Sequence, residues 1–321
     1  MTLARTFSLV SRGGKNYALN RPFCVSFEVT KRCNARCHHC HLHGVKDDKV
    51  ASPQEFGEMS RQLNPVVAQI SGGEPLLRKD VEDIIRAVRR PDRAPVIVLT
   101  TNGVLLSKDK LNSLMSAGVD SISLSLDYPD ERHDAFRQVK GLFSRISSLM
   151  TELNGTASDV ITVSCVLQRD NFRDAVKIAH LAREWGICAN FSTYTWLRTQ
   201  NKEYMIDDQH LPEFKETIDQ LIQHKKEYKN IRTSEYVFRN MIEYFEKGEM
   251  DHCRAGERFL VVNPDATLSP CGLIITEYQT LKEVQDEFCP TNTCGLCYTS
   301  IRANTEKPLS VLVKDNLQSR T

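Results

Sequence analysis

The sequence predicts an α/β fold built from six strand-then-helix units that follow one another along the chain. Apolar segments expected to form strands cover 23–30, 65–70, 95–99, 119–124, 160–167 and 187–194. Helical patterns cover 53–63, 81–90, 108–117, 132–153 and 171–185. Alternation of this kind favours parallel strands joined by right-handed crossovers. Six strands are too few to close the usual eight-stranded barrel.

Each of the first four strand segments ends in residues typical of a ligand-binding loop. The four loops are Cys33–Cys40, Ser71–Pro75, Thr100–Gly103 and Ser125–Asp127. Barrel enzymes bind their ligands at the carboxyl ends of parallel strands. We therefore expect these loops to form the functional site.

The composition is that of an ordinary soluble protein and argues against several functional classes. The net charge is +1, the apolar fraction is 40% and there is no long basic tract, so a nucleic-acid partner is not expected. No stretch is long enough to span a membrane. The eleven cysteines are better explained as metal ligands than as disulfides, which predicts a cytoplasmic location.

Cys33, Cys37 and Cys40 have the spacing C-x3-C-x2-C. Thiolates favour iron–sulfur clusters, zinc or copper(I). Three thiolates can hold three irons of a [4Fe–4S] cube and leave the fourth iron open to a small molecule. The same spacing permits a zinc knuckle whose fourth ligand is one of four neighbouring histidines: His38, His39, His41 or His43. The spacing alone leaves both interpretations open.

A second cysteine set lies near the C-terminus and consists of Cys253, Cys271, Cys294 and Cys297. Segments 257–263 and 266–271 predict a β-hairpin, and a short helix is expected at 281–288. One thiolate before the hairpin, one after it and a C-x2-C turn can form a tetrahedral site. That site suits zinc or a [4Fe–4S] cluster. Cys289 is a less favoured ligand, and we expect Cys24, Cys165 and Cys188 in the core.

The order of the motifs resembles that of the radical S-adenosylmethionine (SAM) enzymes. The cysteine loop, Gly72-Gly73-Glu74-Pro75, Thr101-Asn102-Gly103 and Ser125-Leu126-Asp127 occur in the family's order, and the similarity covers residues 22 to about 200. The resemblance implies a partial (β/α)6 TIM barrel open on one side. It also implies a catalytic [4Fe–4S] cluster on Cys33, Cys37 and Cys40, with SAM chelating the fourth iron.

The resemblance further implies which residues contact SAM. Main-chain groups of Gly72 and Gly73 should meet the methionine amino group, and Glu74 should shape that turn. Ser125 and the region of Thr101 and Asn102 should meet the ribose and the carboxylate.

Three further side chains are expected near this site. His39 occupies a position where similar proteins carry an aromatic residue that contacts adenine, so its imidazole should supply the stacking face. Arg169, after the fifth strand, either pairs with the SAM carboxylate or is a solvated loop charge. Asp127 either lines the substrate cavity or caps the next helix.

Residues 1–21 form a basic segment whose charges are Arg5, Arg12, Lys15 and Arg21. Leu3, Phe7 and Val10 would share one face of a short helix. Gly13-Gly14 should end this helix early, which favours a helix packed over the end of the barrel rather than one that meets anionic lipid.

The second cysteine set resembles the Twitch domain, a shortened relative of the SPASM domain. The resemblance implies that 251–321 form a small β-hairpin/α domain with an auxiliary [4Fe–4S] cluster held by four cysteines. Such a cluster has no free site for substrate, so we expect it to transfer electrons. The predicted segments are 1–21, the partial barrel at 22–250 and the auxiliary-cluster domain at 251–321.

The predicted function is therefore that of a radical SAM oxidoreductase. It would cleave SAM reductively to a 5′-deoxyadenosyl radical, abstract hydrogen from a small-molecule metabolite or cofactor precursor, and pass an electron to the auxiliary cluster. Flavodoxin or ferredoxin is the expected reductant. Three alternatives remain: a ribosomal-peptide maturase, a radical rearrangement or cyclisation enzyme, and a zinc-stabilised binding module.

Overall fold

The computed structural model describes residues 3–42, 44–46, 48–274, 276–308 and 310–311. His43, one of the candidate zinc ligands, lies outside the described residues. The chain divides into two compact units. The first comprises Met1–Arg36, Leu42–Ser123 and Arg254–Thr293, and the second comprises Cys37–His41, Leu124–Cys253 and Cys294–Thr321.

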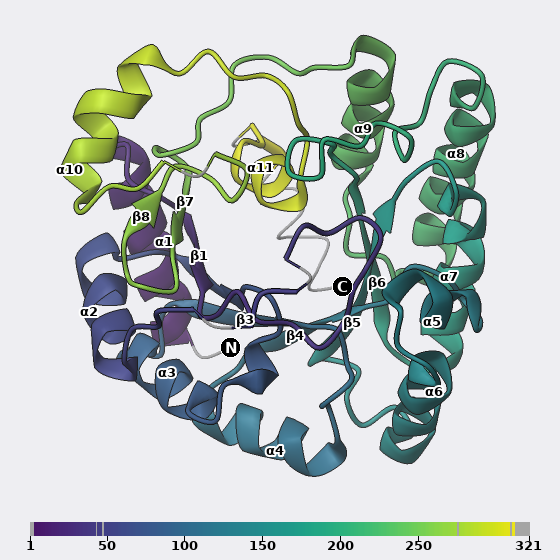
Figure 1. The fold of residues 1–321 in the computed structure, drawn as a ribbon, viewed down its shortest axis with the longest axis horizontal. Helices are drawn as coiled ribbons and strands as arrows, with labels where there is room; N and C mark the ends of the chain where they lie inside the picture. Colours follow the sequence, from purple (N-terminus) through teal and green to yellow (C-terminus); the bar gives the residue numbers. More distant parts are fainter. Residues whose placement is uncertain (1–2, 43, 47, 275, 309, 312–321) are drawn as a thin grey trace. The chain divides into compact units, whose positions relative to one another are not determined.

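The described strands form one sheet in the order β6-β5-β4-β3-β2-β1-β7-β8 (Figure 1). Their bounds are β1 (Cys24–Glu28), β2 (Val67–Ser71), β3 (Val96–Thr101), β4 (Ser121–Ser125), β5 (Ile161–Leu167), β6 (Cys188–Thr193), β7 (Phe259–Val262) and β8 (Leu268–Ser269). In the first unit β1 pairs in parallel with β2 and β7, and β2 with β3. In the second unit β5 pairs in parallel with β6. The predicted α/β fold with a largely parallel sheet is confirmed, and it is consistent with a partial TIM barrel.

The helices form near the predicted positions, except that one predicted helix is divided into two. Those between strands are α2 (Pro53–Leu63), α3 (Val81–Val88), α4 (Lys108–Ala117), α5 (Arg132–Arg137), α6 (Leu142–Leu153) and α7 (Ala175–Glu184). The pattern at 132–153 was predicted as one helix but forms two, because Gln138 and Gly141 adopt positive φ angles of 53° and 75°. Four further helices are α8 (Leu211–Tyr228), α9 (Glu235–Lys247), α10 (Leu281–Glu283) and α11 (Ser300–Thr305).

The predicted hairpin is present, and it extends the main sheet of the first unit. Its two strands, β7 and β8, pair antiparallel with Val261 opposite Ser269. β7 also pairs in parallel with β1, with Cys24 opposite Phe259. The division into 1–21, 22–250 and 251–321 stays a prediction about domains, since the two compact units follow different boundaries.

Helix α1 (Leu3–Ala18) continues through Gly13 and Gly14, so the expected early end was wrong. Side chains on both sides of the glycines anchor it. Arg12 donates to the Pro65 carbonyl and to Asp92, and Asn16 donates to the carbonyls of Pro22 and Asn64. Because these acceptors directly precede strands, α1 covers the amino ends of strands in the first unit, as the packed-helix interpretation predicted. Phe7 and Val10 do not pack inward, since they are 77% and 68% exposed.

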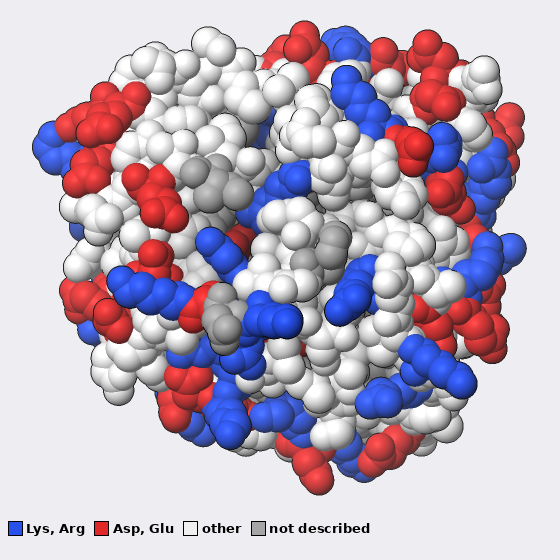
Figure 2. Space-filling view, in the orientation of Figure 1, with Lys and Arg blue, Asp and Glu red and all other residues white. Residues whose placement is uncertain are grey.

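The described helices include none that is long and apolar enough to cross a membrane. On the face shown in Figure 2, acidic and basic side chains are interspersed, in keeping with the net charge of +1.

Asp120 joins α1 to the strands of the first unit. Its carboxylate accepts two hydrogen bonds from Arg5, one from Arg89 and one from the backbone of Ile97, all between 2.7 and 2.8 Å. Burial alone would raise the pKa of Asp120, but the bonds from Arg5, Ile97 and Arg89 lower it. The ionised carboxylate is thus the common acceptor for two arginines.

We predict that Asp120→Asn lowers the free energy of unfolding by about 2 kcal/mol, because two partly buried guanidinium groups lose their counter-charge. Chemical denaturation measures the change. The matched control is Asp83→Asn, whose ion pair with Arg86 is exposed and whose loss should cost no more than about 0.5 kcal/mol. Equal effects of the two substitutions would contradict the role given to Asp120.

Candidate functional site

The turn after β2 lies directly against the loop that follows β1. The N–H of Gly73 donates to the Thr30 carbonyl at 2.7 Å, and that of Glu74 donates to the Arg32 carbonyl at 2.8 Å. A Cβ atom at Gly72 would lie 2.2 Å from the Thr30 oxygen, and one at Gly73 would lie 2.1 Å from the Arg32 oxygen. Only glycine fits at these positions. The two glycines therefore bring the turn against the start of the cysteine loop.

Glu74 links this turn to the end of β3. Its carboxylate is fully buried. One oxygen accepts from the Thr101 hydroxyl at 2.8 Å and from the backbone N–H of Leu76, and the other accepts from the backbone N–H of Asn102 at 2.7 Å. The bond from Leu76 agrees with the predicted role in shaping the turn. The bonds to Thr101 and Asn102 add a link between two strand ends.

Asn102 connects the end of β3 to the first cysteine. Its amide nitrogen donates to the Asn34 side chain at 2.7 Å and lies 3.8 Å from the sulfur of Cys33. The backbone N–H of Ala35 also donates to that sulfur, at 3.4 Å. Donors directed at sulfur favour the thiolate, which is the form that binds metal.

In the second unit, the turn from Cys37 to Cys40 packs on the end of α5. The N–H of Cys40 donates to the Cys37 carbonyl at 3.1 Å, and that of His38 donates to the Phe136 carbonyl at 3.2 Å. The His39 ring stacks on the Phe136 ring with centroids 4.9 Å apart. Burial lowers the pKa of His39 to about 4, so this imidazole is neutral at physiological pH.

Asp127 does not cap the next helix, since Glu131 precedes α5 as its N-cap. The Asp127 side chain is fully buried, and its proposed place in a substrate cavity stays a prediction. Its carboxylate forms an ion pair with Arg137, with Nε and Nη2 at 2.7 and 2.6 Å from one oxygen. Its backbone N–H donates to Nδ1 of His133 at 3.2 Å. The Ser-Leu-Asp motif thus anchors α5.

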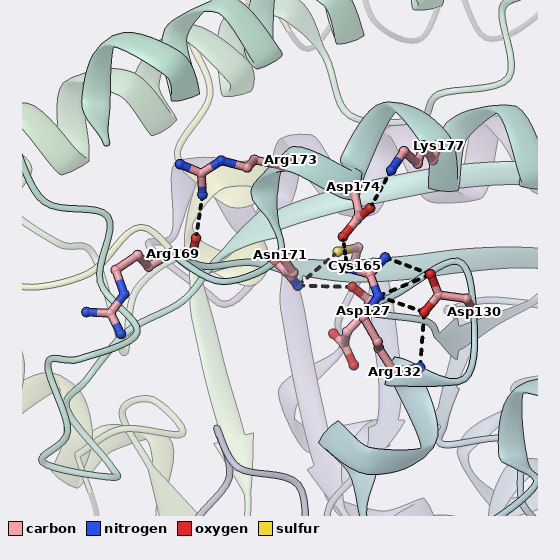
Figure 3. A network of polar contacts seen from close by, with 9 residues as sticks. All are labelled: Asp127, Asp130, Arg132, Cys165, Arg169, Asn171, Arg173, Asp174 and Lys177. Atoms are coloured by element: carbon pink, nitrogen blue, oxygen red, sulfur yellow. Dashed lines mark hydrogen bonds and ion pairs between the residues drawn. The ribbon is translucent and has the colours of Figure 1, made fainter. Parts of the chain in front are cut away.

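The end of β5 carries two buried amides and one half-buried arginine. Asn171 donates to the Asp127 carbonyl at 3.2 Å and to the Val166 carbonyl at 3.0 Å, which ties the ends of β4 and β5 together (Figure 3). Gln168 is fully buried, yet neither atom of its side-chain amide has a hydrogen-bond partner among the described residues. The Arg169 side chain points away from this network and pairs with Asp170 at 3.2 Å.

The remaining predicted contacts lie at strand ends. Ser125 is the last residue of β4 and is half-buried, while Thr101 is buried with its hydroxyl bonded to Glu74. His41 is half-buried, and its Nε2 lies 3.1 Å from Nη1 of Arg198. The predicted roles of Ser125, Thr101 and Arg169 toward SAM stay predictions.

The donor set of the cysteine loop fits an iron–sulfur cube. None of these three described cysteines forms a disulfide, and two N–H groups approach the sulfur of Cys33. Among the residues described, no three His, Cys, Asp or Glu side chains converge as the ligands of a single ion would. A cube distributes its cysteines over several irons, so its ligands do not share one metal atom.

Three cysteines of the second set lie in the second unit and are linked by backbone contacts. The N–H of Cys253 donates to the Cys294 carbonyl, and that of Met250 to the Gly295 carbonyl, both at 2.8 Å. A Cβ at Gly295 would lie 2.3 Å from the Met250 oxygen, so glycine is required there.

The buried guanidinium of Arg302 braces the same loops. It donates to the Cys297 carbonyl at 2.6 Å and also to the Asp251 carbonyl. Cys271, in the first unit, accepts a hydrogen bond at sulfur from the N–H of Leu273 at 3.4 Å. Three of the four predicted ligands are thus brought together within one unit.

Comparison with known proteins identifies the barrel region. The family model "Radical SAM superfamily" matches residues 27–211. An AdoMet-dependent heme synthase of Methanosarcina barkeri is 32% identical over 178 residues, which are 53% of this chain and 50% of that protein. A probable GTP 3′,8-cyclase of Methanocaldococcus jannaschii is 29% identical over 223 residues, 64% of this chain and 72% of that protein. The matched region thus spans about half the length of the heme synthase.

A solved structure shares the fold. Streptococcus suis SuiB bound to its precursor peptide SuiA aligns with a TM-score of 0.67 at 17% identity, over 95% of this chain and 76% of that one. The likeness concerns the fold alone.

We predict that stability falls with acid through His133, which is fully buried. Burial and the charge of Arg137 lower the pKa of His133 to about 4, whereas a histidine in the unfolded chain titrates near 6.5. Above pH 6.5 the imidazole is neutral in both states, and the contribution of His133 to the free energy of unfolding is fully present. As the pH falls from about 6.5 to about 4, the unfolded chain binds a proton at this histidine that the folded protein does not, so this contribution is lost.

Denaturation between pH 7.5 and 4 checks this dependence. His133→Gln should make the loss of unfolding free energy shallower, by on the order of 1 kcal/mol per unit of pKa difference removed. The exposed His252→Gln should keep the wild-type slope. A His133→Gln variant with the wild-type slope would disprove the assignment.

Proposed function

Because the chain belongs to the radical SAM superfamily, we propose that it is an oxidoreductase that uses SAM and two [4Fe–4S] clusters to oxidise a small-molecule metabolite or cofactor precursor. Membership of the family makes it a radical SAM enzyme, with a SAM-bound [4Fe–4S] cluster. The oxidative reaction, the second cluster and the class of substrate are the proposed parts.

Cys33, Cys37 and Cys40 would hold the catalytic cluster. When bound, this cluster supplies the electron that cleaves SAM and so yields the 5′-deoxyadenosyl radical that takes hydrogen from the substrate. The glycine turn at Gly72 and Gly73 would present backbone groups to the methionine end of SAM. A flavodoxin or ferredoxin in the cytoplasm would supply the electron.

Polar groups at the strand ends would orient SAM and substrate. Ser125 is half-buried and offers a hydroxyl, and His39 would meet adenine as a neutral ring. The amide of Gln168 has a donor and an acceptor that are both buried and have no described partner. Since such groups are costly to leave unpaired, a bound polar ligand is a fitting partner for Gln168.

The observation that carries the oxidative proposal is the second cysteine set. Cys253, Cys294 and Cys297 are held together by backbone hydrogen bonds and by Arg302. Together with Cys271 they would supply the four thiolates that a fully ligated [4Fe–4S] cluster requires. A cluster without an open iron suits electron transfer, and a substrate radical must lose one electron to become an oxidised product.

A rearrangement or cyclisation is the second candidate. It is favoured by the similarity to the probable GTP 3′,8-cyclase over 64% of this chain. The two candidates differ in electron balance, because a rearrangement gives an isomer of the substrate and an oxidation gives a product two electrons poorer. The mass of the product therefore separates them.

We predict that anaerobic reconstitution gives about eight irons per chain, four for each cluster. Changing Cys33, Cys37 and Cys40 together to Ala should leave about four, because only the auxiliary site would still have its ligands. Iron, sulfide and zinc analyses measure the content. A wild-type protein with about four irons and one zinc would rule out two clusters.

We predict that Cys294→Ala combined with Cys297→Ala separates SAM cleavage from substrate oxidation. The cysteine loop and the glycine turn are unchanged, so 5′-deoxyadenosine should still form, while oxidised product should not. Metabolites suggested by neighbouring genes are the substrates to test, with product followed by mass spectrometry.

Circular dichroism and SAM binding must accompany that assay, because the loop around Cys297 can depend on its metal for packing. If the well-folded double variant oxidises the substrate at the wild-type rate, the auxiliary cluster is not the electron acceptor.

A further inference from the structure

Helix α1 turns polar side chains toward the protein and apolar side chains toward the outside. Arg5, Arg12 and Asn16 are at most 9% exposed, whereas Phe7 is 77% and Val10 is 68% exposed. A surface helix ordinarily has the opposite arrangement, with its apolar stripe against the core and its polar groups outside. Packing within the first compact unit therefore does not account for the outward side chains of α1.

The outward apolar side chains form one exposed strip, which we call the α1 strip and define as Phe7, Val10, Tyr17 and Leu19. Tyr17 and Leu19 are 55% and 51% exposed. Eight large apolar side chains of the described residues are exposed, and four of them are in this strip. A Cβ atom at Gly14, between Val10 and Tyr17, would have no neighbour within 4 Å, so nothing described covers the middle of the strip. Exposed apolar side chains gathered in one place mark an interaction surface.

The inward face fixes α1 along its length and so holds the strip in place. Arg5 pairs with Asp120 at 2.7 Å, Arg12 pairs with Asp92 at 2.9 Å, and Asn16 donates to two backbone carbonyls. The helix has 16 residues, which give it a length of about 24 Å. A straight, anchored ridge of this kind suits a flat partner surface better than a pocket.

The exposed charge next to the α1 strip is mainly basic. Every charged side chain between residues 1 and 27 is basic. Lys15 is exposed and Arg21 is half-buried. Arg93 is also exposed, and it follows Asp92, whose carboxylate pairs with the inward Arg12. A partner surface should therefore be apolar in part and negatively charged.

We propose that α1 docks this enzyme on an anionic lipid surface, with the α1 strip among the headgroups and Lys15, Arg21 and Arg93 against the lipid phosphates. Helices bind in the plane of a lipid interface in this way, because they bury an apolar face there and attract anionic lipids. A second copy of the chain is a poorer fit, because two copies that met at this face would bring their basic groups together. The proposal does not depend on the substrate or on the second cysteine set.

Docking through α1 leaves the candidate site accessible. The helix covers the amino ends of strands in the first unit, since its side chains bond to residues that directly precede them. Cys33 and the glycine turn follow the carboxyl ends of β1 and β2. SAM cleavage should therefore be the same with and without an intact α1 strip.

The test is flotation of the anaerobically reconstituted full chain with vesicles of phosphatidylcholine and phosphatidylglycerol in equal parts. The wild-type protein should bind these vesicles at least about tenfold more tightly than vesicles of phosphatidylcholine alone. Phe7→Ser combined with Val10→Ser should lower the partition coefficient at least about tenfold, because two apolar side chains are no longer buried. Lys15→Gln should lower it about fivefold.

The matched control is Leu105→Ser combined with Met115→Ser, which removes two exposed apolar side chains of the same compact unit outside α1. It should bind vesicles like the wild type, and all variants should keep the wild-type circular dichroism and SAM cleavage. Binding that survives Phe7→Ser with Val10→Ser, or that is equal on the two kinds of vesicle, would overturn the proposal.

Phe7→Trp supplies a second measurement that keeps the strip apolar. Its fluorescence should shift to shorter wavelength when the anionic vesicles are added, beyond any change in the wild type, which has two tryptophans. If the double serine variant does not fold, this measurement decides, and the absence of a shift refutes the proposal. A wild-type protein that does not float but forms a dimer in sedimentation velocity would assign the strip to a second copy and also refute lipid docking.

Discussion

The buried carboxylate of Glu74 is the contact on which the first half of the site depends. It joins the turn after β2 to Thr101 and Asn102 at the end of β3. Gly72 and Gly73 bring the same turn against the loop after β1 with no space for a Cβ atom. Three strand ends are thus fixed to one another before any cofactor binds. Asn102 also restrains Cys33, because its side-chain amide contacts both this cysteine and Asn34.

In the second unit, buried arginines connect the loops. In the first unit, the Glu74 carboxylate and close backbone contacts do so. Two buried arginines link loops in the second unit: Arg137 pairs with Asp127, and Arg302 donates to the Cys297 carbonyl. Desolvating a guanidinium is costly, and both arginines have acceptors that offset this cost.

The sequence was sufficient to predict most of the helices and strands, but not the side-chain contacts that hold the loops between them, and the cysteine ligands stay predictions. The strand ends were predictable because hydrophobic periodicity is a local property of the sequence, and the cysteine spacing is read from the sequence directly. The continuation of α1 through Gly13-Gly14 was not, because contacts made by Arg12 and Asn16 with distant residues outweigh the local preference of glycine. Arg137 was also missed, because a charged helical residue is usually solvent-exposed. Its only local signal is the i, i+4 spacing from the buried His133.

The central claim is that the Cys33–Cys40 loop is a catalytic cluster site, and SAM cleavage tests it most directly. Reconstituted protein is reduced under anaerobic conditions with SAM, and 5′-deoxyadenosine is quantified by liquid chromatography. The wild-type protein should form 5′-deoxyadenosine, and Cys37→Ala should form none, because only three thiolates hold the cluster. Cleavage that persists in Cys37→Ala, after correction for free iron, would contradict the account.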